Sequence, residues 1–197
     1  LTYIPIEDRI SSLQYIFEAL ERTKNRIEAV IPAIRIRHNK EAGKLIISSS
    51  SAEIKIEVNL VGRGIIGESQ KWPLCHKAQS EFNAFVVMPT VPMGQLYGGK
   101  ICAALDRQHP RDLFDVKYLL ENEGFSEEVK AGFFLNLLGS DRPIHEVLSP
   151  NLLDHRVSLL NQFEGMSTEP FTYSDFERVR ESLIKVIHRS LSAKDKE

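Results

Sequence analysis

The sequence predicts an α+β protein in which a strand-rich half precedes a helical half. Between residues 34 and 88, apolar and polar residues alternate over several short segments with the two-residue period of strands. From residue 93 onward, apolar residues recur every three or four positions, which is the period of amphipathic helices. Pro89 and Pro92 stand where the period changes. We therefore expect an α/β core over residues 1–92 and a helical lobe over residues 93–197.

The strand-rich half should begin with the end of a strand and continue into a long amphipathic helix. A hairpin follows, because two alternating segments flank a turn that contains Asn39 and Gly43. Pro89 and Pro92 should then break the last strand. The expected elements are strand residues 1–5, a helix over 7–30, strands over 34–38, 44–48, 53–61 and 81–88, and a glycine-rich loop over 61–73.

The helical half should contain a pair of helices joined at His109–Pro110. Proline fits the first turn of a helix, where its missing N–H is not needed. Gly98 and Gly99 are unexpected inside the preceding helix, since each glycine weakens a helix by about 1 kcal/mol relative to alanine. Ser174 and Glu177 have the spacing of a capping box. The expected helices are 93–107, 110–120, 127–138, a short segment within 142–150, 151–165 and 173–191.

Composition excludes several classes of protein. The chain has 197 residues, with 25 Lys and Arg against 27 Asp and Glu, so its net charge is −2 and any site for nucleic acid must be a local patch. No apolar run approaches the roughly 18 residues of a membrane span.

Cys75 and Cys102 lack the spacing of a metal site, and we expect two free thiols in a cytoplasmic protein. No His pair has zinc-site spacing, and no Ser lies in a nucleophile elbow.

The strand over residues 53–61 has one apolar face and one polar face, and the polar face allows two interpretations. At the edge of a sheet, Lys55 and Glu57 would be solvated. In a central strand, Glu57 would be a buried carboxylate that needs a cation or a metal as its partner. Glu53 and Lys55 also have the carboxylate-x-Lys spacing of some nucleases, so a metal-dependent nuclease is an alternative.

Arg63 lies between Gly62 and Gly64 in the glycine-rich loop. The glycines of this loop lack the spacing of a phosphate-binding P-loop. An arginine between two glycines can nevertheless reach a phosphate or a carboxylate.

The polar centre of residues 96–120 is the strongest candidate for a functional site. Lys100 and Arg107 lie two turns apart on one face of a helix, and Arg111, Asp112 and Asp115 lie within about one turn of the next helix. One interpretation is an ion-pair cluster that joins the two helices. The other is a site in which Lys100 holds a phosphate and a carboxylate accepts a proton.

Three segments together resemble the AbiEii/MenT-like nucleotidyltransferases, the toxin halves of abortive-infection (phage-defence) and toxin–antitoxin pairs. They read IKIEVN, LYGGKICAALDRQHPRDLFDVKYLLENEG and RPIHEVLSP, and the most specific part runs from the motif lysine to Arg-Asp-Leu-Phe-Asp. The resemblance implies a nucleotidyltransferase-like mixed β-sheet core followed by a helical lobe. It places Glu57 at a third-carboxylate position, Lys100 at the lysine that contacts the triphosphate, and Asp112 at the distal motif. We assign catalysis to Glu57 and Asp112, nucleotide binding to Lys100, Arg107 and Arg63, and supporting roles to Arg111, Asp115 and Lys55.

The family's Asp-x-Asp pair and the glycine motif before it do not occur in these 197 residues. The resemblance therefore implies a shortened or N-terminally truncated member with little activity. For the intact enzyme it implies Mg²⁺, held in part by Glu57, and transfer of a nucleotide from a nucleoside triphosphate to an acceptor hydroxyl. The acceptor would be an RNA end such as tRNA, or a protein, and a cognate antitoxin would be a partner. The alternative to an enzyme is a non-catalytic module that binds RNA or the antitoxin.

Overall fold

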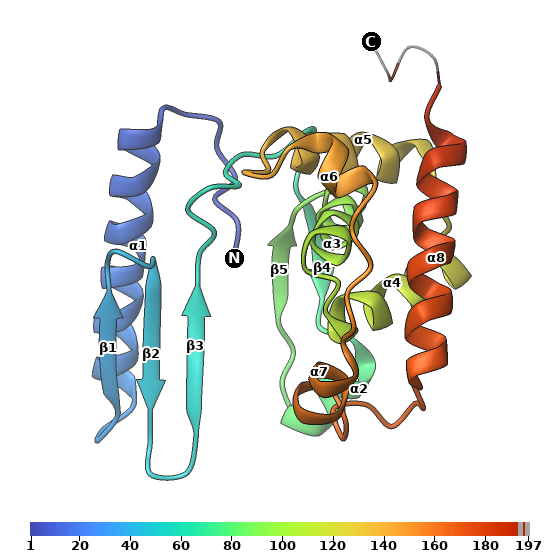
Figure 1. The fold of residues 1–197 in the computed structure, drawn as a ribbon. Coiled ribbons are helices and arrows are strands. Elements are labelled where there is room, and N and C mark those ends of the chain that lie inside the picture. Colours follow the sequence, from blue (N-terminus) through green and yellow to red (C-terminus); the bar gives the residue numbers. More distant parts are fainter. Residues whose placement is uncertain (193–194, 196–197) are drawn as a thin grey trace. The chain divides into compact units, whose positions relative to one another are not determined.

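The computed structural model describes residues 1–192 and 195, which form two compact units, Leu1–Val91 and Pro92–Glu197 (Figure 1). Each unit is described by itself. Unit 1 contains α1 (Arg9–Val30), β1 (Arg35–Asn39), β2 (Lys44–Ser48), β3 (Glu53–Glu57), β4 (Gln70–Pro73), α2 (His76–Phe82) and β5 (Val87–Thr90). Unit 2 contains α3 (Met93–Arg107), α4 (Pro110–Asn122), α5 (Glu127–Leu138), α6 (Ile144–Leu148), α7 (Arg156–Gln162) and α8 (Tyr173–Ser190).

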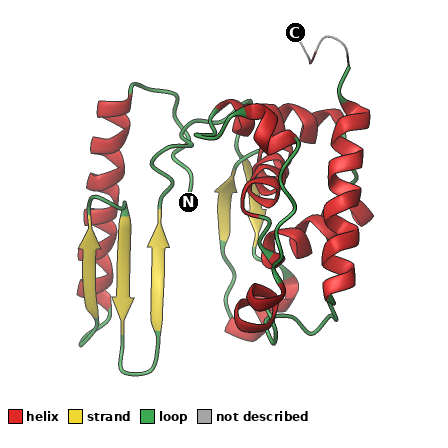
Figure 2. Ribbon diagram, viewed as in Figure 1, coloured by secondary structure: helices red, strands yellow, loops and turns green. Residues whose placement is uncertain are grey.

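The expected α+β composition is confirmed among the described residues, since strands are confined to unit 1 and unit 2 is helical (Figure 2). The strands do not form one mixed sheet, however. Strands β1, β2 and β3 form an antiparallel meander, and β4 pairs with β5 in a separate antiparallel sheet. No described helix is both long enough and apolar enough to cross a membrane.

Helix α1 packs on one face of the β1–β2–β3 sheet (Figure 1). Asp8 caps the helix by accepting hydrogen bonds from the first-turn amides. Ile16 and Leu20 are buried against Leu45 and Ile47 of β2, so the alternating residues of the strand separate an inner from an outer face.

Strand β3 is shorter than expected and lies at the edge of its sheet, with β2 as its one described neighbour. The first residues of the chain are not a strand, but they run beside its end: the Leu1 nitrogen donates to the Glu57 carbonyl and the Asn59 amide donates to the Leu1 carbonyl. The edge position means that the outer side chains of β3 are exposed to solvent.

The segment from residue 70 to residue 90 differs most from expectation. The expected strand over 81–88 is wrong, because α2 extends to Phe82 and ends at Asn83 in the left-handed conformation. Pro89 does not break the strand but lies within β5, opposite Lys71. A proline is tolerated there because β5 has a partner on one side only.

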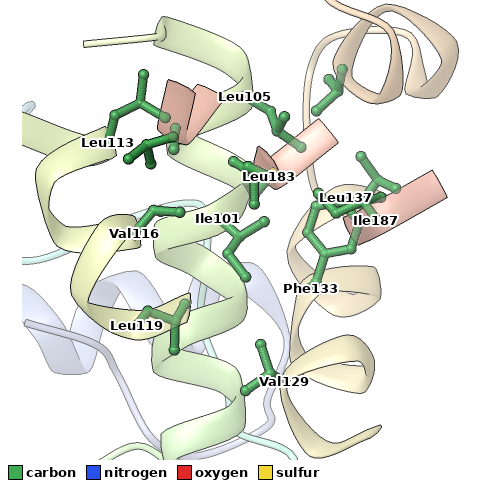
Figure 3. Close-up of a cluster of buried hydrophobic side chains, with 14 of the residues drawn as sticks. Ile101, Leu105, Leu113, Val116, Leu119, Val129, Phe133, Leu137, Leu183 and Ile187 are labelled. Atoms are coloured by element: carbon green, nitrogen blue, oxygen red, sulfur yellow. The ribbon is translucent and has the colours of Figure 1, made fainter. Parts of the chain in front are cut away.

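The core of unit 2 gathers apolar side chains from α3, α4, α5, α6 and α8, and Figure 3 shows most of these residues. Ile101, Leu113, Phe133 and Leu183 are completely buried in it. At about 25 cal/mol per Å² of buried apolar surface, each such side chain stabilises the unit by about 2 kcal/mol. This core fixes α3 and α4, which carry the candidate site.

Two helix boundaries in unit 2 differ from expectation. The capping box of α8 is formed by Thr172 and Asp175 rather than by Ser174 and Glu177, because the helix begins at Tyr173. Helix α7 is shorter than the expected 151–165, and residues 151–155 before it have no regular secondary structure. Cys75 and Cys102 are free thiols, as expected, and burial raises the pKa of the Cys102 thiol.

Candidate functional site

Among the described residues, two ion pairs join α3 to α4, and we call the region that they occupy the α3–α4 seam. One of these pairs joins Lys100 to Asp115. Lys100 Nζ lies 2.5 Å from Asp115 Oδ2, and each side chain is 40% exposed. An ion pair at this exposure contributes at most about 1 kcal/mol to stability. The Lys100 ammonium is therefore available to exchange its carboxylate partner for the phosphate of a ligand.

Beside this pair the surface forms a hollow of about 470 Å³. Its volume falls within the range of small-molecule sites. Tyrosine rings can stack on a planar base, while the amide, the ammonium and the carboxylates supply polar contacts. The lining residues are Tyr97, Lys100, Asp115, Tyr118, Leu119, Asn122 and Glu123.

Five of these residues were not predicted from the sequence as part of a site: Tyr97, Tyr118, Leu119, Asn122 and Glu123. A signal was present, because Tyr97 precedes Lys100 by three positions and Tyr118 follows Asp115 by three. Residues three apart on a helix are neighbours on its surface. Helical periodicity applied to polar and aromatic residues would have placed them beside the charged pair.

A second ion pair crosses the seam near the junction of the two helices. Arg107 Nη2 donates to Asp112 Oδ1 over 2.9 Å. The arginine side chain is 61% exposed and the aspartate side chain only 17%. The second oxygen of Asp112, Oδ2, is buried and has no hydrogen-bond partner in the structure. One oxygen of the Asp112 carboxylate is therefore bound to Arg107, whereas the other makes no hydrogen bond and is able to accept one.

The junction itself is built by His109 and Pro110. His109 caps α4, with its ring Nδ1 accepting from the Arg111 amide over 3.2 Å, and Pro110 occupies the first helical position. This turn places Asp112 in the first turn of α4, where the helix dipole favours a negative charge.

The Arg111 side chain does not pair with Asp115. Its Nη2 atom lies 3.1 Å from the sulfur of Met166, and Asp115 pairs with Lys100 instead. Of the arginine–aspartate pairs that the ion-pair interpretation allowed, the structure contains Arg107–Asp112 and not Arg111–Asp115. The wider expectation of ion pairs that join the two helices is correct, since Arg107 and Lys100 both reach across to α4.

A buried polar network lies behind the α3–α4 junction. Gln108 is 2% exposed and its Nε2 donates to the Asn151 carbonyl, while Arg180 Nη1 donates to Gln108 Oε1 and to the Leu153 carbonyl. Arg180 is 6% exposed. Burial, together with the nearby Arg180 charge, lowers the pKa of His155. The network fixes the end of α3 against α8 and so holds the junction in place.

Glu57 and Lys55 belong to unit 1 and lie on the outer side of β3. The Glu57 side chain is 60% exposed and lies 3.0 Å from Lys44 Nζ, so it is not the buried carboxylate of a central strand. Lys55 is also 60% exposed and lies 3.8 Å from Glu53. Of the two interpretations of this strand, the structure agrees with the solvated edge.

Arg63, also in unit 1, is folded back onto its own loop. Its Nη1 atom donates to the carbonyls of Leu60 and Val61, and its Nε atom is buried without a partner. The carbonyls already occupy part of the guanidinium, so binding a phosphate would require the side chain to turn out of the loop.

The described residues do not form a magnesium site made by the protein alone. Among residues 1–192 and 195, no three His, Cys, Asp or Glu side chains are grouped so that they could hold a metal ion. The nearest charged partner of Glu57, the predicted ligand, is the Lys44 ammonium. Mg²⁺ prefers several oxygen ligands in octahedral geometry, and a single exposed carboxylate does not supply them.

Comparison with known protein families identifies the class of protein. A family model described as nucleotidyl transferase AbiEii toxin, type IV toxin–antitoxin system, matches residues 1–189, so the class is a nucleotidyltransferase-type toxin. The chain belongs to the AbiEii family, and the resemblance inferred from its motifs is confirmed. No curated protein and no solved structure matches the chain.

Proposed function

We propose that the protein transfers a nucleotide from a nucleoside triphosphate to an acceptor hydroxyl, with the α3–α4 seam as the nucleotide-binding part of its site. The acceptor we propose is an RNA end such as that of tRNA, with a protein hydroxyl as the alternative. The observation that carries this proposal is the exposed Lys100–Asp115 pair beside a hollow with two tyrosines, in a chain of the AbiEii family. We propose that the reaction takes place in the cytoplasm, where nucleoside triphosphates and RNA are found, and that a cognate antitoxin controls it.

In the proposed reaction, the acceptor oxygen attacks the α-phosphorus of the triphosphate. A new P–O bond forms, the bond between the α- and β-phosphates breaks, and pyrophosphate leaves. Lys100 holds the phosphates as a compact point charge, and Arg107 adds a guanidinium at the other end of the seam. A base whose pKa lies near the working pH transfers protons best.

Asp112 is the proposed acceptor of the proton from the attacking hydroxyl. Its Oδ2 atom is buried without a partner, whereas Oδ1 is held by Arg107. Because Oδ2 is shielded from solvent, we propose that the bound acceptor displaces the covering side chains before this oxygen takes the proton, while Arg107 holds Oδ1 and keeps the carboxylate in position.

Magnesium is the proposed companion of the triphosphate, and Glu57 is the one ligand that we assign to it. When bound, the metal would neutralise charge on the transferring phosphate. Because the described residues do not form its site, no step is assigned to it.

The test uses Lys100→Ala, with Lys185→Ala as its matched control. Both lysines form an ion pair with a carboxylate on a helix of unit 2, but Lys185 lies on α8, outside the hollow. Each variant is incubated with labelled nucleoside triphosphates and either total tRNA or total protein, and triphosphate binding is measured by calorimetry.

Lys100→Ala is expected to reduce transfer about 100-fold, the usual effect of removing one preorganised charge contact to a reacting group. It should also weaken triphosphate binding, while Lys185→Ala leaves both unchanged. Equal transfer and equal binding by the two variants would remove the assigned role of Lys100.

A further inference from the structure

Among the described residues of unit 1, no helix lies on one face of the β1–β2–β3 sheet. Helix α1 covers the other face, where Ile36, Leu45 and Ile47 belong to the apolar core of unit 1 (Figure 1). Because side chains alternate across a sheet, the open face is set by the strand register. Its residues are Arg35, Arg37 and Asn39 from β1, Lys44, Ile46 and Ser48 from β2, and Glu53, Lys55 and Glu57 from β3.

The register arranges the charges of this open face in rows across the three strands. Arg37 is paired with Ile46, which is paired with Lys55, so two cations flank an aliphatic side chain in the middle row. Neighbouring strands lie about 4.8 Å apart, which puts the backbones of Arg37 and Lys55 roughly 10 Å apart. Arg35 lies on the same strand face as Arg37, roughly 7 Å along β1.

Arg35 and Arg37 are the two cations of the open face that have no carboxylate partner on it. Both carboxylates of the face already have lysine partners, since Glu57 lies 3.0 Å from Lys44 and Glu53 lies 3.8 Å from Lys55. Neither arginine makes an ion pair with any carboxylate among the described residues, and both are exposed. The chain as a whole has a net charge of −2, so this positive charge is a local feature.

The shape of the face selects among anionic ligands. The cations lie on an open strand surface and are spread over roughly 10 Å, so they suit an extended chain of phosphates better than a single compact group. Guanidinium groups bind phosphate oxygens in pairs of hydrogen bonds and stay charged at any physiological pH. Ile46, in the middle row, offers an apolar contact to a base that faces the sheet.

We propose that the open face of the β1–β2–β3 sheet binds the phosphate backbone of single-stranded RNA through Arg35 and Arg37. The inference rests on the proposed function in one respect, that the bound RNA is the acceptor. The RNA contacts then lie on the same sheet face as Glu57, and the nucleotide-binding role stays with Lys100.

The test is the double variant Arg35→Gln/Arg37→Gln, with binding of a short labelled single-stranded RNA followed by fluorescence anisotropy over a series of salt concentrations. Its matched control is Arg22→Gln/Arg26→Gln, which removes the same charge from the exposed side of α1. Circular dichroism of both variants checks that the fold is kept.

The sheet variant is expected to bind RNA about tenfold more weakly, and its plot of log affinity against log salt should be shallower by about 1.4, or 0.7 for each lost contact. The α1 variant should bind as the unchanged protein does. Equal weakening by the two variants, or no weakening by the sheet variant, overturns the inference. So does equal competition by polyglutamate, because it would show that any polyanion suffices.

The RNA-binding proposal and the nucleotide-transfer proposal can fail independently of each other. If the sheet variant loses RNA binding while Lys100→Ala binds nucleoside triphosphates as tightly as Lys185→Ala does, the binding face stands and the nucleotide-binding role of Lys100 fails. If transfer depends on Lys100 but RNA binding is insensitive to Arg35 and Arg37, the transferase proposal stands and the binding face fails.

Discussion

Asp112 and Asp115 lie one turn apart on α4, yet their carboxylates have different surroundings. Asp115 is 40% exposed and faces an equally exposed lysine, so water shares in its solvation. Asp112 is 17% exposed, and one of its oxygens has neither a protein partner nor access to solvent. A buried oxygen without a partner costs free energy, about 1–3 kcal/mol for a typical polar group. Such a cost is more readily explained by a role in binding or catalysis than by a role in stability.

Asp112→Asn tests this difference at the level of a single residue. The substitution keeps the size of the side chain but removes its charge and its capacity to accept a proton. We expect nucleotide transfer to fall at least about 100-fold, the lower range for loss of a general base. Stability should change by less than about 1 kcal/mol, because the Arg107 partner is largely exposed. Transfer assays and urea unfolding measure the two effects.

The control for this prediction is Asp106→Asn, which removes a carboxylate that pairs with Arg142 at 3.0 Å. Asp106 lies on α3 next to Arg107 but takes no part in the seam with α4. If the two variants lose the same amount of transfer, the loss reports a general change of charge and Asp112 is not the base.

Residue spacing predicted which charges gather at the seam but not how they pair. Lys100 and Arg107 were correctly placed on one face of a helix, and Asp112 and Asp115 on one face of the next. Arg111 shares that spacing, yet it contacts Met166. Which residue each charged side chain pairs with depends on how α3 and α4 cross and on a segment more than fifty residues away. The periodicity of a single helix carries no information on either.

Gly94 and Gly98 allow α3 to approach α5 more closely than any other residue would. A Cβ atom at Gly98 would lie 2.1 Å from the Phe133 backbone nitrogen, and one at Gly132 would lie 2.1 Å from the Gly94 carbonyl oxygen. Gly98, which seemed unfavourable in the sequence, is thus required by packing, whereas Gly99 is not. Gly98 lies on the α5 side of α3 and Lys100 on the side of the hollow, so this packing fixes the helix that presents the lysine.

Gly98→Ala should destabilise unit 2 by about 3 kcal/mol, since two backbones would have to move apart. Gly99→Ala is the matched control. Its Cβ would meet only the Asn136 side chain, at 3.2 Å, and alanine itself favours the helix by about 1 kcal/mol. We expect that variant to unfold within about 1 kcal/mol of the unchanged protein in urea. Equal destabilisation by both substitutions would mean that helix α3 is not held by this close contact.

The elements with clear local signals were predicted well. Helices α3 and α5 were predicted residue for residue, α3 because Pro89 and Pro92 end the strand region before it, and α5 because its apolar residues lie in one uninterrupted segment. Strand β4 and helix α2 were missed. A four-residue strand and a seven-residue helix are too short to show a period, and β4 is a strand only because it pairs with β5.

At the scale of the whole molecule, the buried apolar residues form two separate clusters. The cluster of unit 1 contains Ile16, Leu20, Leu45 and Ile47, and the larger one contains only residues of unit 2. Each unit therefore has its own source of hydrophobic stability, and each can open by itself if its own cluster is weakened. The change from strand to helix periods at Pro89 and Pro92 predicted a boundary near residue 92, whereas the exposed face of the sheet became visible only from the strand register.

Leu45→Ala and Phe133→Ala test whether the two clusters are energetically independent. Both side chains are completely buried, so each truncation should destabilise its own cluster by about 3 kcal/mol or more. Hydrogen exchange of Leu45→Ala should show faster exchange in α1 and in β1–β3, with the amides of α3, α4, α5 and α8 protected as before. Phe133→Ala should show the reverse. If either variant accelerates exchange in both clusters to the same extent, the chain unfolds as one cooperative unit, and a substitution in the sheet could then not be assumed to leave the Lys100 site intact.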